Sequence, residues 1–102
     1  MKGYLVDYDI EAESDLVRLR DWLVANRRYE YAMEYLQMLK SEVADLSFLA
    51  ASLGQSKYRL PNLYHPEAKT LTVCHRKLTV IFHIDGEYVI VDKILPSCMI
   101  TY

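Results

Sequence analysis

The feature that most constrains the fold of this chain is a change in the spacing of its apolar residues. Residues 3–10 alternate apolar and polar side chains, which is the period of a half-buried strand. From Ala12 to Leu53 the apolar residues recur every three or four positions, which is the spacing of one helix face. After Gly54 the alternation returns and continues to Pro96. This order predicts a strand, a helical region and then a run of strands.

The helical region divides into two predicted helices joined by a short link. The first ends at residues 26–28, where an asparagine and two arginines suit a helix C-terminus. The second is expected to run for about six turns and to end near Gly54. Its apolar stripe consists of Ala32, Leu36, Leu39, Val43, Leu46, Ala50 and Leu53. Such a stripe also suits a coiled coil, but the short link favours an antiparallel helical hairpin that packs on a sheet.

Three or four mainly antiparallel strands are predicted in the C-terminal half. They are expected at residues 57–60, 70–75, 78–84 and 87–95, with a loop at 62–66. Asp85-Gly86 is the strongest hairpin signal, because glycine adopts the positive φ that tight hairpin turns require. Helices grouped ahead of such strands indicate a two-layer α+β fold. We expect the helical hairpin to cover one face of the sheet and the other face to stay partly open.

Length and composition exclude several classes of protein. A chain of 102 residues is the size of one domain, so residues 1–102 are expected to form a single one. The content of 52% hydrophobic and 25% charged residues excludes a disordered or low-complexity chain. No apolar run approaches the ~20 residues of a membrane span, and the N-terminus lacks a signal-peptide pattern. We therefore expect a cytoplasmic protein that has no membrane partner, with reduced thiols at Cys74 and Cys98.

The net charge of −2 is an average of two unequal halves. Residues 1–56 carry 6 basic and 10 acidic side chains, whereas residues 57–102 carry 6 basic and 4 acidic ones and all 3 histidines. Cations beside aromatic residues can contact phosphates and stack on bases, although a solvated sheet edge can have the same composition. Nucleic acid is therefore not excluded as a partner, but free RNA should bind weakly and lose affinity quickly with salt.

Two groups in the basic half are candidates for chemistry. His75-Arg76-Lys77 lies between two predicted strands, where it could hold a phosphate or simply be a solubilising hairpin tip. His83 lies on the less apolar face of its strand, as an acid or base or as a half-buried structural histidine. No metal site is expected, because the sequence lacks His-x-His and HExxH patterns. Cys74 is expected to be a small core residue rather than a nucleophile.

Two segments carry the motifs of a known family. The first is Ala12-x-x-Asp15-Leu16-x-x-Leu19-x-x-Trp22-Leu23, followed by Ala32, Leu39, Val43 and Leu46 in the next helix. The second is residues 78–91, which are similar to a "YRIIYxIDGxxVxI" hairpin, with Ile94-Leu95 leading into a C-terminal signature. Together these motifs span about residues 3–102 and resemble the RelE/ParE toxin superfamily, which includes plasmid-stabilisation proteins.

The resemblance implies a RelE-like fold and a function as the toxin of a bacterial type II toxin–antitoxin module. RelE-like members are endoribonucleases (mRNA interferases) that cleave mRNA at the ribosome without a metal or cofactor. ParE-like members inhibit DNA gyrase without catalysis. Members of both kinds are held inactive by a cognate antitoxin protein, which adds a strand to the sheet or a helix to the hairpin. A degenerate member that only binds its antitoxin is a third alternative.

The RelE-like interpretation implies roles for particular residues. The phosphate-binding residues would be Lys57, Arg59, Arg76 and Lys77, and the candidates for proton transfer would be His75, His83 and Tyr102. Thr79 and Cys98 stand where the family often has basic residues, which departs from the ribonuclease pattern. The sequence therefore leaves both mRNA and gyrase open as targets.

Overall fold

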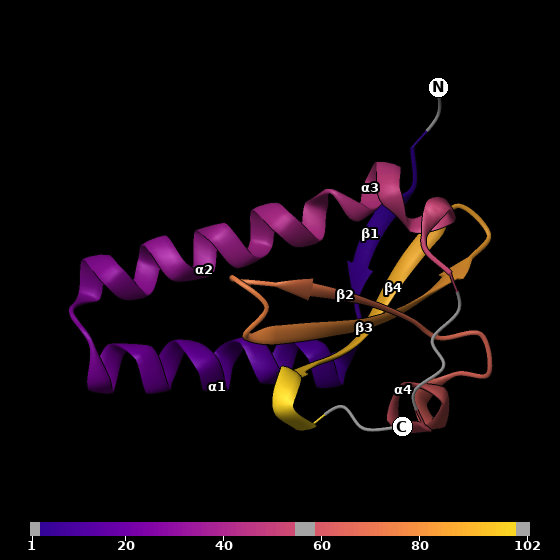
Figure 1. Cartoon of the computed structure of the whole chain (residues 1–102). Coiled ribbons are helices and arrows are strands. Elements are labelled where there is room, and N and C mark those ends of the chain that lie inside the picture. The colour runs from indigo at the N-terminus through magenta and orange to yellow at the C-terminus, as the bar shows by residue number, and fades with distance from the viewer. Residues whose placement is uncertain (1–2, 55–58, 100–102) are drawn as a thin grey trace.

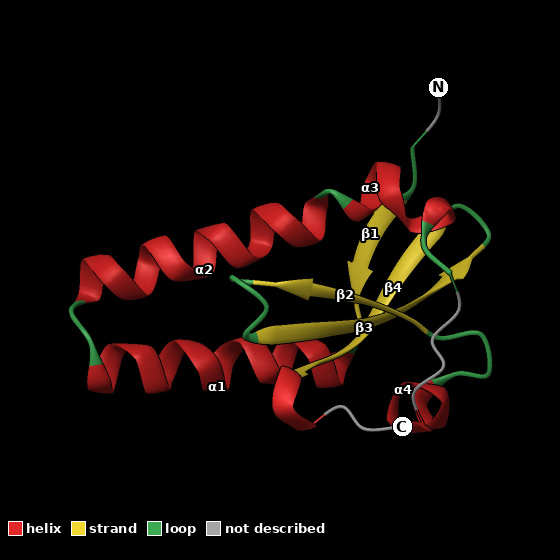
Figure 2. Cartoon of the chain, viewed as in Figure 1, coloured by secondary structure: helices red, strands yellow, loops and turns green. Residues whose placement is uncertain are grey.

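A helical layer packs on one face of a four-stranded sheet in the computed structural model, which describes residues 3–54 and 59–99 (Figure 1). The elements are β1 (Leu5–Tyr8), α1 (Ile10–Asn26), α2 (Tyr29–Ala44), α3 (Leu46–Leu49), the 3₁₀ turn η1 (Ala50–Ser52), α4 (Arg59–Tyr64), β2 (Lys69–Val73), β3 (Leu78–Asp85), β4 (Tyr88–Pro96) and the 3₁₀ turn η2 (Ser97–Met99). Figure 2 shows α1 and α2 as an antiparallel pair. The predicted α+β fold, with a strand and two helices ahead of mainly antiparallel strands, is confirmed.

The sheet has the strand order β1-β4-β3-β2. β1 runs parallel to β4, while β4 with β3 and β3 with β2 are antiparallel pairs. The hairpin signal at Asp85-Gly86 is confirmed, since Asp85 pairs with Tyr88 across a two-residue turn. Gly86 has a φ of 61°, a conformation that a side chain would strain.

Burial of the predicted apolar stripe creates the main core. All of its residues except Leu53 are buried, and α2 contributes Leu39 and Val43 to the centre. The sheet contributes Phe82 and Val91, which are likewise fully buried. Each large aliphatic side chain buried in this way stabilises the fold by roughly 1.5–3 kcal/mol. The seam between helices and sheet is therefore the main source of stability.

The expected six-turn helix is wrong in one respect, because α2 ends at Ala44 and a short α3 follows. The N–H of Asp45 is shared between the carbonyls of Ser41 and Glu42, at 3.3 and 3.2 Å, which tightens the chain at the helix end. α3 then lies against the start of β1. A Cβ on Gly3 would meet the Ser47 Oγ at 2.7 Å and the Ser47 carbonyl oxygen at 3.1 Å, so a larger residue here would require Ser47 to shift.

The strand expected at 57–60 is wrong at its described residues, since α4 occupies residues 59–64. The loop expected at 62–66 is wrong at 62–64 for the same reason and confirmed at 65–66. Pro61 lies in the first turn of α4, where its missing N–H removes no helical hydrogen bond. The segment after α4 covers the face of the sheet opposite the helical hairpin. Ala68, Ile81 and Leu95 form a small buried cluster there with Tyr64 at its margin, so this face is less open than expected.

Candidate functional site

His83 and Asp92 form a hydrogen-bonded pair on the face of the sheet opposite the helical hairpin. The register of β3 and β4 shifts between Ile81 and Phe82, which leaves Asp92 without a directly opposite residue. His83 pairs with Ile90, so Asp92, two residues further along β4, lies diagonally across from His83. The distance from His83 Nδ1 to Asp92 Oδ2 is 2.7 Å.

The environment of this pair sets its proton arrangement. The side chains of His83 and Asp92 are only 14% and 12% exposed. Burial raises the pKa of Asp92, while the hydrogen bond from His83 opposes that rise. An ionised Asp92 can only accept this hydrogen bond, so the neutral form of His83 that pairs with it donates from Nδ1 and has its lone pair on Nε2. His83 is therefore arranged as a base.

A second imidazole lies on the first. The rings of His65 and His83 stack with centroids 4.0 Å apart and planes 2° from parallel. His65 Nδ1 accepts the backbone N–H of Glu67 at 3.0 Å, so the neutral His65 ring carries its proton on Nε2. The two rings are thus assigned opposite tautomers: His83 offers a lone pair at Nε2 and His65 offers a proton at Nε2.

The other predicted site residues lie elsewhere or outside the described residues. His75, Arg76 and Lys77 are exposed in the turn between β2 and β3, as the hairpin prediction required. Five residues of β3 separate His83 from that turn, about 16 Å of strand, so the structure does not bring His75 and His83 together. Lys57 and Tyr102 fall outside the described residues, and Arg59 is described only as the first residue of α4.

The β2–β3 turn has an unusual backbone. Cys74, His75 and Arg76 have φ angles of 54°, 58° and 67°, which is left-handed for three consecutive residues with side chains. Two hydrogen bonds hold the turn: the Cys74 N–H donates to Glu42 Oε2 at 2.8 Å, and the Lys77 N–H donates to the Cys74 carbonyl at 3.2 Å. α2 therefore supports the turn directly.

The Cys74 side chain is fully buried beneath this turn, as predicted for a core thiol. Burial raises the pKa of the Cys74 thiol, so the thiolate that a nucleophile needs is disfavoured. The same surroundings raise the pKa of Tyr35 to about 12, chiefly through burial. Both groups are therefore neutral hydrogen-bonding partners at neutral pH.

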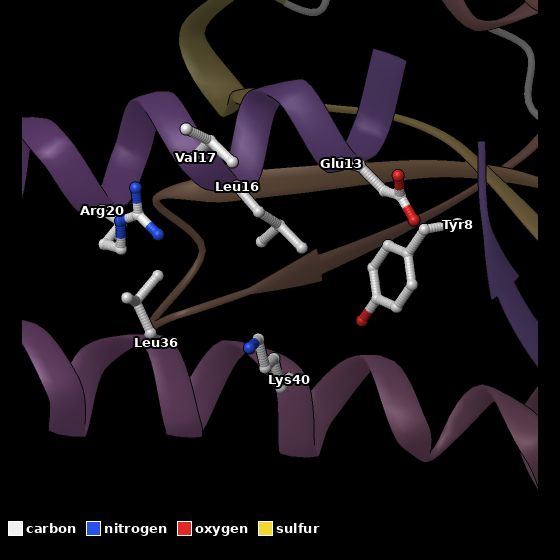
Figure 3. A pocket seen from close by; sticks show the side chains of 7 residues that line it. All are labelled: Tyr8, Glu13, Leu16, Val17, Arg20, Leu36 and Lys40. Atoms are coloured by element: carbon white, nitrogen blue, oxygen red, sulfur yellow. The ribbon is translucent and has the colours of Figure 1, made fainter. Parts of the chain in front are cut away.

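A cavity of about 320 Å³ opens between α1 and α2, beside the end of β1 (Figure 3). Leu16, Glu13 and Arg20 reach it from α1, and Lys40 points into it from α2. Its lining includes Glu13 and Lys40 but no histidine or cysteine. The stacked rings of His65 and His83 lie outside this cavity.

Two further observations limit the chemistry of the described residues. No group of three or more His, Cys, Asp or Glu side chains within 3–54 and 59–99 is placed to hold a metal ion. Over the same residues, no helix combines the length and apolar character needed to cross a membrane.

Comparison with known proteins defines the fold type. No protein-family model and no curated protein matches the sequence. A chain of the solved structure "Chromosomal ParDE TA system from P. aeruginosa" superposes with a TM-score of 0.76 at 21% identity, covering 92% of this chain and 96% of that chain. The fold is that of a ParE-type toxin. The expected RelE/ParE-like architecture is thereby confirmed, at an identity that shows the fold alone.

Proposed function

We propose that this chain is the toxin of a bacterial type II toxin–antitoxin module and that it cleaves RNA with His83 and His65. The toxin assignment is supported by the ParE-type fold and by the similarity to a chain of a ParDE toxin–antitoxin structure. The observation that carries the ribonuclease assignment is the stacked pair of imidazoles, in which His83 is hydrogen-bonded to Asp92 and His65 accepts the N–H of Glu67. One ring then offers a base and the other a hydrogen-bond donor for the phosphate, which supports metal-independent RNA cleavage.

The proposed reaction is attack of a ribose 2′-OH on the adjacent phosphate. His83 Nε2 takes the proton from the 2′-OH as the oxygen bonds to phosphorus, and Asp92 stabilises the imidazolium that forms. The bond to the 5′-oxygen breaks, and that oxygen takes a proton from water, while the His83 imidazolium gives its proton to the hydroxide left behind. The His65 Nε2–H donates a hydrogen bond to the phosphate. The products are a 2′,3′-cyclic phosphate and a free 5′-hydroxyl.

Residues 57–102, which include most of the sheet, are only mildly basic. We therefore expect another molecule to help position the RNA substrate. Arg76 and Lys77 are exposed and could contact phosphates of flanking nucleotides. Thr79, where the family often has a basic residue, is only 3% exposed and shares a 2.8 Å hydrogen bond with Ser97. We therefore propose mRNA on the ribosome as the substrate, with a cognate antitoxin as the inhibiting partner in the cytoplasm.

A second candidate is inhibition of DNA gyrase without catalysis. One observation favours it, the likeness to a ParDE structure. Thr79 and Cys98 depart from the ribonuclease pattern, but they do not themselves point to gyrase. In this case the histidine pair would be structural, and the toxicity would not depend on His83.

Induced expression of the full chain in bacteria without its antitoxin separates the two candidates. The test variant is His83→Asn, whose amide can still donate to Asp92 although it cannot act as a base. The matched control is His75→Asn, because asparagine tolerates the left-handed backbone of the turn. If the chain cleaves RNA with His83, the parent and the His75→Asn control cut transcripts and stop growth. The His83→Asn variant then does neither. Growth arrest with intact transcripts and DNA-damage signalling in both variants would refute cleavage and support the gyrase candidate.

A further inference from the structure

Two adjoining cavities form one groove on the helical side of the molecule. They measure about 240 and 160 Å³, and both are lined by Tyr31, Tyr35 and Lys77. The groove lies where the helical hairpin meets the β2–β3 turn. We name it the aromatic groove; its other lining residues are Leu19, Trp22, Leu23, Arg27, Glu34, Met38, Cys74 and His75.

The walls of the aromatic groove are exposed ring systems. Trp22 is 54% and Tyr31 is 47% exposed, although both lie beside an apolar floor. Tyr31 and Tyr35 lie with ring centroids 6.1 Å apart and planes tilted by 33°. Rings that remain exposed at the edge of a cavity offer large flat surfaces to a ligand.

The charges around these rings favour an anionic ligand. The Arg27 guanidinium lies over the Tyr31 ring at 5.9 Å, and Lys77 lines both cavities. His75 adds a group that can become cationic, whereas Glu34 is the one carboxylate in the lining. The groove therefore combines stacking surfaces with two permanent cations.

The strained turn supplies a second, independent indication of a ligand site. Left-handed backbone at residues with side chains costs about 1–2 kcal/mol per residue, and such strain clusters at functional sites. Here it affects Cys74, His75 and Arg76, and Glu42 stabilises it from α2. The result is that Lys77 and His75 line the cavity that contains Tyr31 and Tyr35.

From these observations we propose that the aromatic groove binds single-stranded nucleic acid by base stacking. Aromatic walls with interspersed cations are the usual surface for unpaired bases and their phosphates. The groove lies on the helical side, whereas His83 faces away from the helices, so the groove does not include the proposed general base. Lys77, which lines the groove, is the residue that it shares with the proposed phosphate contacts of the cleavage site.

Trp22 makes a direct test possible, because it is the one tryptophan of the 102-residue chain. The full chain is titrated at low salt with a single-stranded oligodeoxynucleotide of about 12 nucleotides. This probe lacks the 2′-OH and cannot be cut by the proposed reaction. Stacking should quench the Trp22 fluorescence saturably, and added salt should weaken binding.

Matched variants localise the binding. Tyr31→Ala and Lys77→Ala should each weaken binding at least about fivefold, because each removes a stacking or phosphate contact. The controls are Tyr29→Ala and Lys40→Ala, whose exposed side chains lie outside the groove, and both should bind as the parent does.

Three outcomes would overturn the proposal: no quenching up to about 0.1 mM oligonucleotide at low salt, unchanged affinity in both groove variants, or equal quenching by a polyglutamate peptide. The last would show a site for acidic peptides instead. The experiment is also separable from the proposed function. Normal quenching without RNA cleavage would refute only the cleavage, and cleavage without quenching would refute only the groove.

Discussion

The two faces of the sheet are covered in different ways. The face toward α1 and α2 buries a continuous apolar core that includes Leu39, Val43 and Phe82. The opposite face has a small cluster around Ile81 beneath the segment that follows α4, and the histidine pair lies on this face. One face therefore provides most of the apolar burial, and the other provides the groups that can transfer protons.

This difference explains how a small domain can hold a buried acid. A partly buried carboxylate is costly unless it is hydrogen-bonded, and Asp92 meets this condition through His83. The large core on the other face stabilises the sheet strongly enough to tolerate the remaining cost. Substitutions on the two faces should then change the free energy of unfolding and the rate of RNA cleavage independently.

The largest effect should come from the histidine face and should appear in activity. His83→Asn is expected to lower RNA cleavage by about 10²–10⁴-fold, because the general base is lost. Its free energy of unfolding should change by less than about 1 kcal/mol, since the amide can still donate to Asp92. Cleavage is measured on purified protein, with or without ribosomes, and stability by urea unfolding. A large stability loss in this variant would contradict the proposed division of roles.

The helical face should show the reverse pattern. Leu39→Ala is expected to lower the free energy of unfolding by about 2–5 kcal/mol, because it leaves a cavity in a fully buried site. Leu63→Ala is the matched control on α4, where the side chain is 72% exposed, and should change stability by less than about 0.5 kcal/mol. Urea unfolding compares the two. Similar losses in both variants would show that the core is not confined to the helical face.

Much of this two-sided arrangement was predictable from the sequence. The helical stripe and the strand alternation follow from burial alone, so the main layer was predicted together with the hairpin at Gly86. The His83–Asp92 pair could also have been found. A two-residue turn that pairs Asp85 with Tyr88 sets Ile90 opposite His83, and Asp92 lies diagonally on the same face.

The remainder depends on tertiary contacts that periodicity does not encode. Pro61 directly follows the strand expected at 57–60, where a proline is typical of a strand end. It is equally compatible with the first turn of a helix, and only packing decides between these. The position of His65 follows from α4, so its stacking on His83 could not be predicted. The left-handed turn likewise depends on Glu42, which lies 32 residues before Cys74 in the sequence.

The strained turn should show a moderate effect on both stability and binding. Glu42→Ala is expected to lower the free energy of unfolding by about 1–3 kcal/mol, because the Cys74 N–H loses its acceptor. Relaxation of the turn should also weaken oligonucleotide binding in the aromatic groove. Glu34→Ala is the matched control: it removes an exposed carboxylate from the same helix and should not destabilise the chain. Equal stability of the two variants would show that Glu42 does not support the turn.

Asp92→Asn should have the smallest effect on stability. Whether it raises or lowers the free energy of unfolding shows whether Asp92 serves the reaction or the fold. Burial raises the pKa of Asp92 in the folded state. The folded state therefore binds this proton more tightly than the unfolded state does. The stability that the bound proton contributes is fully present below the ordinary pKa of an aspartic acid, and it is lost as the pH rises through the raised pKa of Asp92. At neutral pH the variant should be at least as stable as the parent, and this advantage should disappear on acidification.

RNA cleavage by the same variant should nevertheless fall by about 10²-fold, because His83 loses the charge that stabilises its imidazolium. Urea unfolding between acidic and neutral pH, combined with cleavage assays, tests both. A variant that is less stable at neutral pH but still cuts RNA would assign Asp92 to the fold rather than to the reaction.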